Sequence, residues 1–434
     1  MMDQTLLEKD IATMALPLLS TQNYDLIVVG GGAAGFMAAI SAAEAGVSSV
    51  LLLEAASKPL QKVLISGGGR CNVTNATWDS RNLAENYPRG RLELLGPFSR
   101  FAAGHAVSWF AERGLALVEE DDGRMFPAEN SSLAVIACLR NSAKAAGVVL
   151  CPKTSIRHIE FKADEGFVLC STKGLTVFGK NILMATGSHK SGLQIASNLG
   201  HKIVSPVPSL FTFSQKNTLL NTCSGISIEG VSIKLNIQNN SYNDAGKLLL
   251  THWGFSGPLI LKMSSFAARD LYFNNYKGEL VVKWIQEDFD LARQIISGFR
   301  EKNPKKTIAA TRLFYNLPKN LWLSLLKQSS VEPLLRWSDI SLKNERSLLK
   351  TLTSSIYFIE GRGPFGEEFV TAGGVDLKDV DLSSMQSKIC PGLYFAGEIL
   401  NIDGLTGGFN FQHCWTSGWL SGQAIAKNMF TINS

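Results

Sequence analysis

Three glycines near the start of the chain have the spacing of a dinucleotide-binding turn: Gly30, Gly32 and Gly35. In that pattern the first glycine permits a tight turn and the second lets the backbone approach a pyrophosphate. The third lets the following helix pack closely on the strand. Ala33 and Ala34 lie within this motif and are predicted to bind the cofactor, because the N-terminus of the helix that the motif opens would offer unpaired N–H groups to phosphates. The alternative is a glycine-rich turn without a ligand.

An acidic residue follows at the distance expected for a ribose contact. Glu54 ends the next apolar segment, 24 residues after Gly30, with Ala55 beside it. A carboxylate there accepts hydrogen bonds from ribose hydroxyls and disfavours a 2′-phosphate. We therefore expect the dinucleotide to be FAD or NAD.

Two short motifs later in the chain favour FAD. Ala185-Thr186-Gly187 resembles the motif at which a chain returns to a flavin domain. Tyr394–Glu398 resembles a second flavin fingerprint, in which an acid after a strand contacts the ribityl chain. Thr186, Gly187, Gly397 and Glu398 are therefore predicted to bind the cofactor. No second Gly-x-Gly-x-x-Gly follows another strand, so NAD(P)H is expected to bind transiently, as the reductant.

A third glycine cluster lies in Ile65–Asn75. Its glycines make a backbone-rich nest for an anion, with one cation, Arg70, beside it. Arg70 would contact the pyrophosphate or stabilise negative charge on a reduced flavin, unless it is a salt-bridged residue of a surface loop. Cys71 fits a small buried thiol better than a nucleophile. The predicted cofactor residues in and before this cluster are Lys62, Ser66, Gly67, Gly68, Arg70, Cys71 and Asn72.

Asn401–Asn410 is a further glycine-rich loop, and it enters the last predicted helix, about Trp415–Met429. N–H groups of such a loop could face the pyrimidine edge of a flavin and stabilise negative charge there. Asp403 is a candidate proton carrier, with a loop-shaping role as an equal alternative. The predicted cofactor residues of this loop are Gly407, Gly408, Phe409 and Asn410.

His252 is the other candidate proton carrier. It lies in Thr251–Pro258, where two glycines permit close approach of the backbone. A lone histidine is more often structural than catalytic.

Apolar periodicity predicts the elements that position these residues. Tyr24–Val29 and Val50–Leu53 are buried strands joined by a helix that Gly46 ends, which is a βαβ unit with parallel strands. We expect an α/β fold: a Rossmann-like FAD-binding domain with a parallel sheet, interrupted by a β-rich insert and a small helical insert. The expected boundaries are 1–22 for an N-terminal extension, 23–188 for the first part of the FAD domain, 189–284 for the β-rich insert, 285–353 for the helical insert, and 354–434 for the second part of the FAD domain.

Bulk properties limit the possible partners. The net charge of +5 and pI near 8.7 would help approach to RNA but do not establish it. The seven cysteines are scattered and form no Cys-x-x-Cys, which predicts no metal site and a cytoplasmic location. No segment has the roughly 18 apolar residues of a membrane span. The oligomeric state is left open.

Taken together, these motifs resemble the BaiN/RdsA-like family of NAD(P)/FAD-dependent oxidoreductases, also labelled aminoacetone oxidase-like flavoproteins. The segments that carry the resemblance are Gly30–Gly35, Ile65–Asn75, Gly123–Pro127, Thr251–Pro258, Thr371–Val375 and Gly392–Gln412. The resemblance implies non-covalently bound FAD in a domain interrupted by two inserts. It also implies reduction of conjugated C=C bonds, in steroid-like enones or in the uracil ring of ribosomal RNA. The sequence departs from the family at Ser188–Gly192, which is shorter, and at Asn401, where an aspartate is usual.

Three functions remain. The first is an NAD(P)H-dependent reductase of an activated C=C bond, in an enone small molecule or in ribosomal RNA. Its proton would come from His252, Asp403 or water. The second is a flavin oxidase of a small amine that uses O₂. The third is a non-catalytic flavin-binding redox sensor, which the candidate proton carriers and the large insert argue against.

Overall fold

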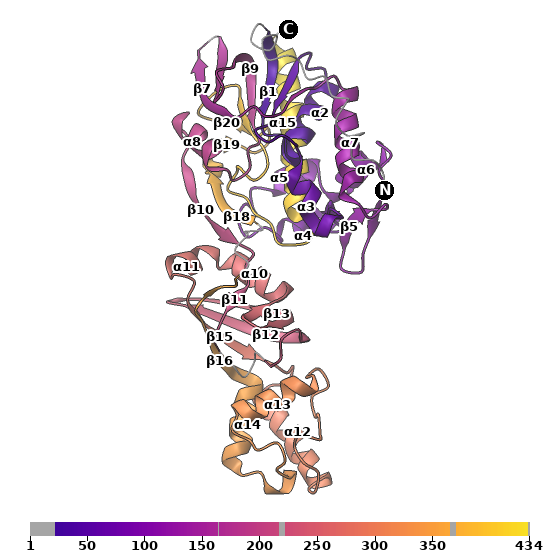
Figure 1. Cartoon of the computed structure of the whole chain (residues 1–434), viewed down its shortest axis with the longest axis vertical. Helices are drawn as coiled ribbons and strands as arrows, with labels where there is room; N and C mark the ends of the chain where they lie inside the picture. The colour runs from indigo at the N-terminus through magenta and orange to yellow at the C-terminus, as the bar shows by residue number, and fades with distance from the viewer. Residues whose placement is uncertain (1–21, 164, 217–221, 365–369, 433–434) are drawn as a thin grey trace. The chain divides into compact units, whose positions relative to one another are not determined.

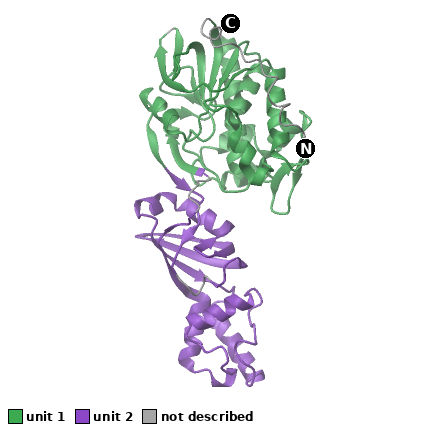
Figure 2. Cartoon of the chain, in the orientation of Figure 1, with its two compact units in different colours: residues 1–206, 371–434 green, residues 207–370 purple. Residues whose placement is uncertain are grey.

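The chain forms two compact units in a computed structural model that describes residues 22–163, 165–216, 222–364 and 370–432. Unit 1 contains residues 1–206 and 371–434, and unit 2 contains residues 207–370 (Figure 2). Most of the predicted N-terminal extension lies outside the described residues.

The sheet of unit 1 confirms the predicted Rossmann-like α/β fold. Its nine strands follow the order β19-β20-β21-β9-β1-β2-β6, with the β7–β8 hairpin attached through β8 to β9. The central pairs are parallel. The strands are β1 (Asn23–Val29), β2 (Val50–Leu53), β6 (Val149–Cys151), β7 (Ile156–Lys162), β8 (Gly166–Ser171), β9 (Thr176–Met184), β19 (Val380–Asp381), β20 (Gln386–Ser387) and β21 (Leu393–Phe395).

The central strands are apolar toward their carboxyl ends, at Leu26–Val29 of β1 and Ile182–Met184 of β9, because helices cover the sheet there. All four residues of β2 are buried. The main helices are α2 (Ala33–Glu44), α7 (Ser132–Ala145) and α15 (Phe409–Ile432), which are labelled in Figure 1. Gly46, with φ of 101°, follows α2 in the left-handed conformation expected after a helix. The last helix begins six residues earlier than predicted, directly after the left-handed Gly408.

Small residues bring α2 and α15 close together. A Cβ on Gly418 would lie 2.6 Å from the Ala34 carbonyl oxygen, and one on Gly422 would lie 2.7 Å from that of Ala38. The two backbones therefore touch at these positions, as they do where small residues line a helix–helix contact.

The other elements of unit 1 surround the sheet. A three-stranded sheet has the order β3-β5-β4, and β10 pairs with β18. These elements are α3 (Gln61–Gly69), β3 (Thr74–Asn75), α4 (Ser80–Ala84), α5 (Leu95–Arg100), α6 (Ala103–Ala111), β4 (Leu117–Glu119), β5 (Arg124–Pro127), α8 (Lys190–Asn198), β10 (Ile203–Ser209), β18 (Val370–Val375) and η3 (Leu377–Asp379).

Unit 2 joins the predicted β-rich and helical inserts around one hydrophobic core. Its sheet has the order β16-β15-β12-β13-β14-β11-β17, with every pair antiparallel. The strands are β11 (Phe213–Ser214), β12 (Ser227–Ile237), β13 (Asn240–Thr251), β14 (Gly254–Ser256), β15 (Gly278–Lys283), β16 (Ser355–Ile359) and β17 (Gly361–Arg362). The helices are α10 (Pro258–Phe266), α11 (Ala268–Phe273), α12 (Phe289–Lys302), α13 (Lys319–Gln328), η2 (Trp337–Asp339) and α14 (Leu342–Ser354).

Both insert boundaries differ from the prediction because of long-range strand pairing. Residues 189–206 contribute α8 and most of β10, and they belong to unit 1. At the other end, β16 is an edge strand of the unit 2 sheet, paired with β15. The insert unit therefore opens after Pro206 and closes at Val370. Among the described residues, no helix is both long and apolar enough to cross a membrane.

The close α2–α15 contact yields a stability prediction. Gly422→Ala should lower the free energy of unfolding by about 1–3 kcal/mol, because a methyl group has no room against α2. Gly298→Ala in α12 is the control. There a Cβ meets no atom within 4 Å, so the same change should raise stability by up to about 1 kcal/mol. Urea unfolding followed by circular dichroism measures both, and equal effects would contradict the packing argument.

Candidate functional site

The predicted cofactor residues gather at one edge of the unit 1 sheet. Val29 lies opposite both Leu53 and Met184, and Met184 lies opposite Phe395, so four parallel strands end in register. Directly after these ends come Gly30, Glu54, Ala185–Gly187 and Ala396–Glu398. The carboxyl ends of parallel strands are where open α/β sheets bind ligands. The structure therefore brings together the segments that were predicted separately.

The three glycines of the first turn have different steric environments. Gly30 is left-handed, and a Cβ there would lie 2.4 Å from the Ala185 carbonyl oxygen. A Cβ on Gly35 would lie 1.9 Å from the Gly30 carbonyl oxygen, so only glycine lets α2 approach the turn. A Cβ on Gly32 would meet no atom within 4 Å. Gly30 and Gly35 are therefore required by the fold, whereas Gly32 borders open space.

The N-terminus of α2 offers N–H groups to an anion, although that of Ala34 also bonds to the buried Cys414 sulfur. No side chain caps the helix at Gly32, and the first intrahelical bond joins Phe36 N–H to the Gly32 carbonyl oxygen, 3.0 Å apart. The N–H groups of the first turn, Ala33 to Gly35, precede that bond. Such groups and the helix dipole favour a phosphate.

Glu54 is held by backbone N–H groups at the end of β2. One carboxylate oxygen accepts from Gly31 N–H and the other from Ala56 N–H, both at 2.6 Å. Ala55 between them is exposed. A carboxylate oxygen accepts more than one hydrogen bond, so this arrangement fixes Glu54 and leaves acceptor capacity for ribose hydroxyls.

Lys62 and Glu398 form an ion pair that links α3 to the turn after β21. Burial lowers the pKa of Lys62, but the adjacent carboxylate outweighs it, and the pKa lies above its ordinary value. Gly187 borders the same carboxylate, since a Cβ there would lie 3.7 Å from Glu398 Oε2. Three predicted cofactor residues thus meet at one point.

Thr186 supplies a test of whether this edge fits a polar cofactor. Its Oγ1 atom is buried and has no hydrogen-bond partner among the described residues. Buried hydroxyls are nearly always paired, so an orphaned one at a ligand edge indicates a missing partner. The orphaned hydroxyl, the uncapped helix and the open space at Gly32 fit the sugar and pyrophosphate of FAD.

Two α15 side chains that the motifs did not reveal hold the Gly397 turn. Ser417 Oγ accepts from Gly397 N–H at 2.9 Å, and His413 Nε2 lies 3.3 Å from the Gly397 carbonyl oxygen. Burial lowers the pKa of His413 to about 4, so the ring is neutral and can donate to that oxygen. The available signal was the spacing of four residues, which places both side chains on one face of a helix.

The glycine cluster in Ile65–Asn75 interrupts the helical backbone of α3. Gly67 and Gly68 are left-handed, and Ser66 is extended. At Gly68 and Gly69 a Cβ would meet nothing within 4 Å, so this backbone is open to solvent or a ligand. The expected nest is therefore present as a backbone feature.

Arg70 is engaged by two protein side chains beside that nest. Its guanidinium pairs with Glu120 at 2.7 Å and lies 4.0 Å from the centre of the Phe126 ring. This is the salt-bridged alternative considered for Arg70. The hydrogen bonds to Glu120 and Asn130 use Nη1, so the pair with Glu120 does not prevent the other guanidinium N–H groups from contacting a cofactor.

Residues 71–75 are joined to the loop before α15. Asn72, with its amide oriented to satisfy both atoms, accepts from Gly408 N–H at 3.0 Å. Asn75 Nδ2 donates to the Gly407 carbonyl oxygen at 3.0 Å, and Trp415 donates to that of Val73 at 2.8 Å. The Gly408 N–H, expected to face a flavin, is therefore engaged by Asn72.

Cys71 lies within this junction and has no sign of reactivity. It is fully buried, and burial raises its pKa to about 12. A thiol with that pKa is not a thiolate near neutral pH, which agrees with the structural interpretation of this residue.

Asp403 lies in the loop as one half of a buried ion pair. Both carboxylate oxygens accept from the Arg89 guanidinium, and the Asp403 side chain is 0% exposed. Asn410 closes the same loop through two 2.9 Å bonds to the backbone of Gly404. Phe409 is buried, and its carbonyl oxygen accepts from Tyr87. This geometry favours the loop-shaping role for Asp403.

Asn401 occupies the position where the family usually has an aspartate. Its side-chain oxygen is buried without a partner among the described residues. It lines a hollow of about 510 Å³ together with Arg89 and Lys378. Ser188–Gly192, the other departure, leads into α8, where His189 caps the helix by accepting from Ser191 N–H.

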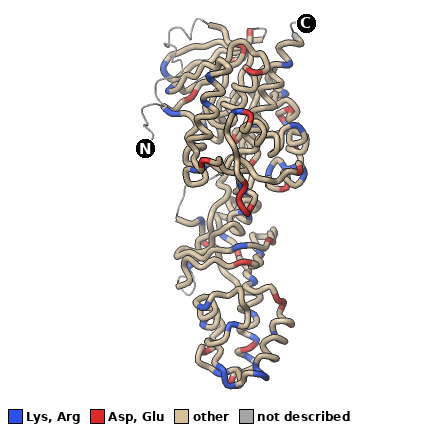
Figure 3. Tube along the Cα trace, turned by 90° about the vertical axis from the view of Figure 1, so that its right-hand side faces the viewer, with Lys and Arg blue, Asp and Glu red and all other residues tan. Residues whose placement is uncertain are grey.

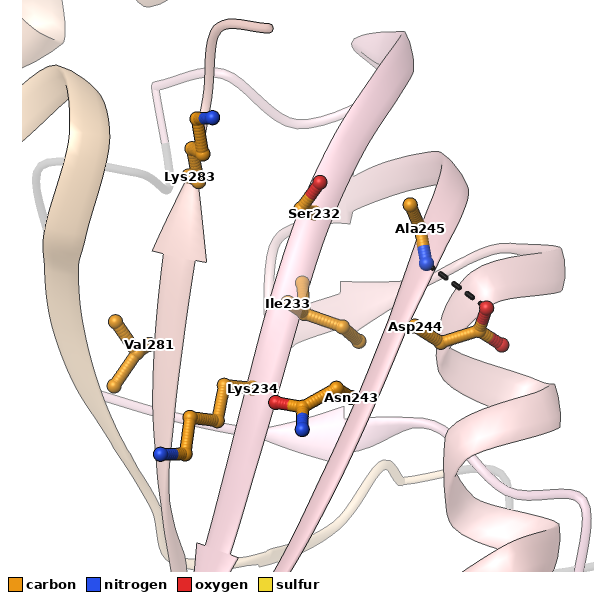
Figure 4. Close-up of a pocket in the computed structure, with 8 residues that line it drawn as sticks. All are labelled: Ser232, Ile233, Lys234, Asn243, Asp244, Ala245, Val281 and Lys283. Atoms are coloured by element: carbon orange, nitrogen blue, oxygen red, sulfur yellow. Dashed lines mark hydrogen bonds between the residues drawn. The ribbon is translucent and has the colours of Figure 1, made fainter. Parts of the chain in front are cut away.

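His252 belongs to unit 2, whereas the residues described above belong to unit 1. It is exposed on the turn between β13 and β14, with its ring edge-on to Trp253 at 4.5 Å. Unit 2 also has a hollow of about 430 Å³ on its sheet, where Lys234 and Lys283 stand on neighbouring strands (Figure 4). No cluster of three or more metal-ligating side chains occurs among the described residues.

Comparison with known proteins extends over almost the whole chain. Residues 24–424 match the family described as "HI0933-like protein Rossmann domain". Ribosomal RNA dihydrouridine synthase of Escherichia coli is 28% identical, over 93% of this chain and 98% of that protein. The 3-dehydro-bile acid delta(4,6)-reductase of Clostridium scindens is 26% identical, over 92% of this chain and 98% of that protein.

Solved structures share the fold. The 3-ketosteroid delta1-dehydrogenase of Sterolibacterium denitrificans has a TM-score of 0.52 at 13% identity, and the match covers 94% of this chain and 100% of that one. A flavocytochrome c3 fumarate reductase has a TM-score of 0.50 at 16% identity, covering 98% and 81%.

Gly32 offers a direct test of the cofactor edge. Gly32→Val should weaken FAD binding by about tenfold or more, because the new side chain enters space left for the pyrophosphate. The fold should be unaffected, since a Cβ there meets no protein atom. Flavin content per protein after gel filtration measures the effect. Gly96→Val, at another open glycine, is the control, and equal flavin content in both variants would refute the assignment.

The Arg89–Asp403 pair predicts a large coupling. Asp403→Asn should lower the free energy of unfolding by about 3–5 kcal/mol, because it removes the buried carboxylate that pairs with the partly buried Arg89 guanidinium. In Arg89→Met/Asp403→Asn the loss should be smaller than the sum of the single losses. Urea unfolding of the four proteins gives the cycle. A loss below about 1 kcal/mol in Asp403→Asn would show that the pair does not hold the loop.

Proposed function

This chain belongs to the HI0933-like family and is an FAD-dependent oxidoreductase, as its motifs indicated, and from that premise we propose that it reduces an activated C=C bond with NAD(P)H. The observation that carries the proposal is the convergence at the sheet edge of Gly32, Glu54, Thr186 and Glu398. The proposal places FAD there, non-covalently bound.

The names of the relatives support the reaction class. One is named for making dihydrouridine in ribosomal RNA, and the other for reducing a bile acid. Both products arise by adding two hydrogens across a C=C bond conjugated to a carbonyl. This chain aligns with nearly the full length of both proteins. We propose the same reaction here, on uracil in ribosomal RNA or on an enone.

Residues of the chain would bind and orient the cofactor. The α2 N-terminus would bind the pyrophosphate, Glu54 the adenosine ribose, and Glu398 the ribityl chain, with Lys62 neutralising that carboxylate. Bound there, FAD supplies two-electron transfer between NAD(P)H and the substrate. His413 and Ser417 would keep the Gly397 turn in position from α15.

The proton that completes the reduction needs a donor outside the Asp403 ion pair. Both Asp403 oxygens face Arg89, so we propose that Asp403 positions the loop. His252 is exposed and carries an imidazole, so it or a water molecule remains the proposed carrier. We also propose a cytosolic location, in keeping with seven cysteines that are all free thiols.

Anaerobic titration of the purified yellow protein tests the reductase. NADH or NADPH should abolish the visible flavin absorbance, and an added enone should restore it without O₂. The Gly32→Val protein is the negative control. Failure of both nicotinamides to bleach a fully loaded protein would sink the proposal, and reoxidation by O₂ alone after reduction by an amine would favour the oxidase.

The RNA branch has its own measurement. Ribosomal RNA from a strain lacking this protein should contain less dihydrouridine than RNA from its parent, as measured by mass spectrometry of nucleosides. Re-expression of the wild-type chain should restore the content, and Gly32→Val should not. Unchanged dihydrouridine in the deletion strain would leave the enone as the proposed substrate class.

A further inference from the structure

The net positive charge of the chain comes from unit 2. Residues 207–370 contain 20 Lys and Arg against 14 Asp and Glu, whereas the rest of the chain contains 22 against 23. Within unit 2 the imbalance lies in residues 285–353, with 12 basic and 7 acidic residues. That excess of five equals the net charge of the whole protein. The blue of Lys and Arg recurs along this segment in Figure 3.

Three of these cations lie on two adjoining segments of backbone. Thr307 and Arg336 form an antiparallel bridge, and Trp337 N–H donates to the Lys306 carbonyl oxygen at 3.0 Å. Ser338 N–H donates to that of Pro304, also at 3.0 Å. Lys305, Lys306 and Arg336 are therefore neighbours, although about 30 residues separate them in sequence, and all three are exposed. We call Lys305, Lys306 and Arg336 the basic cluster.

Neither salt bridges nor a helix dipole account for the basic cluster. Within residues 285–353, all of which are described, the ion pair that forms is Arg300 with Glu345, at 2.9 Å. None of the three cluster residues forms a salt bridge with a described residue, although the Lys306 ammonium lies 5.8 Å from the centre of the Phe299 ring. All three lie outside α12, so the helix dipole does not stabilise them. A face kept only for solubility mixes both signs. Like charges held together favour an anionic partner.

An exposed aromatic ring accompanies the basic cluster. Tyr315 is 95% exposed and stands in the loop between Arg312 and Lys319. The loop that carries Tyr315 begins at the segment paired with Arg336, where Ile308 N–H donates to the Leu335 carbonyl oxygen at 2.9 Å. An aromatic face beside cations suits a nucleic acid, because bases stack on the ring while phosphates meet the cations.

From these observations we propose that the helical part of unit 2 is an RNA-docking surface, with the basic cluster on the phosphate backbone and Tyr315 against a base. The proposal rests on the RNA branch of the proposed function and gives unit 2 its role in that branch. Such contacts would hold the RNA by its phosphates and by one stacked base, and they do not require any particular nucleotide sequence.

Charge reversal of the basic cluster tests the surface. The variant is Lys305→Glu/Lys306→Glu/Arg336→Glu in the full, flavin-loaded chain, with fluorescein-labelled oligouridylate as the probe. Binding should weaken by about tenfold or more. The slope of log K against log salt should fall by about 2, since three contacts on a single strand account for about 0.7 each. Tyr315→Ala should weaken binding without changing the slope.

A matched control carries the same charge change in unit 1. Lys144→Glu/Arg157→Glu/Lys173→Glu alters two lysines and one arginine that are equally exposed. It should bind oligouridylate as the wild type does. Flavin content and circular dichroism of both triple variants should match the wild type, which excludes misfolding as the cause.

The two proposals fail in different ways. Equal affinity and salt slope in the cluster variant and the wild type would overturn the docking surface. So would wild-type protein that ignores oligouridylate, or that binds phosphatidylserine vesicles or polyglutamate as well as RNA. Bleaching by NAD(P)H and enone reduction are measured on the same preparations. Their loss in the wild type would overturn the reductase instead, and the cluster variant should retain both.

Discussion

The close approach of the β1–α2 turn to the end of β9 constrains the rest of unit 1. There is no room for a side chain at Gly30 against Ala185, or at Gly35 against Gly30. Because the turn packs directly against the backbone after β9, the N-terminus of α2 lies at the carboxyl ends of the strands. Glu54, Thr186 and Glu398 follow strands that end in register with β1. One steric requirement thus places a helix N-terminus, an orphaned hydroxyl and two carboxylates at a single edge.

Polar contacts between distant segments then fix the loops above that edge. Asn72 and Asn75 bind the backbone of Gly408 and Gly407, and Arg89 holds Asp403 in the same loop. His413 and Ser417, both on α15, bind the backbone of Gly397. These bonds are made by the chain's own residues, and they fix the conformation of the loops. Such preorganisation lowers the entropy lost on binding.

Local patterns predicted what is local in the structure. The apolar runs of β1, α2 and β2, and the separate roles of Gly30, Gly32 and Gly35, follow from the periodicity and the absence of a Cβ. The partners of Arg70 and Asp403 did not follow, because Glu120 and Arg89 lie 50 and 314 residues away in the chain. The predicted insert boundaries differ from those of the structure for the same reason. β10 and β16 belong to the sheets that they pair with, and the sequence of a single strand does not show its partner.

A structure of the protein with FAD bound tests the central claim most directly. The account predicts the pyrophosphate within hydrogen-bond distance of the N–H groups at the start of α2, and the Thr186 hydroxyl bonded to the cofactor. It also predicts that Asp403 stays paired with Arg89. A flavin bound elsewhere, or bound here with Thr186 Oγ1 still unpartnered and the α2 N-terminus facing solvent, would contradict it.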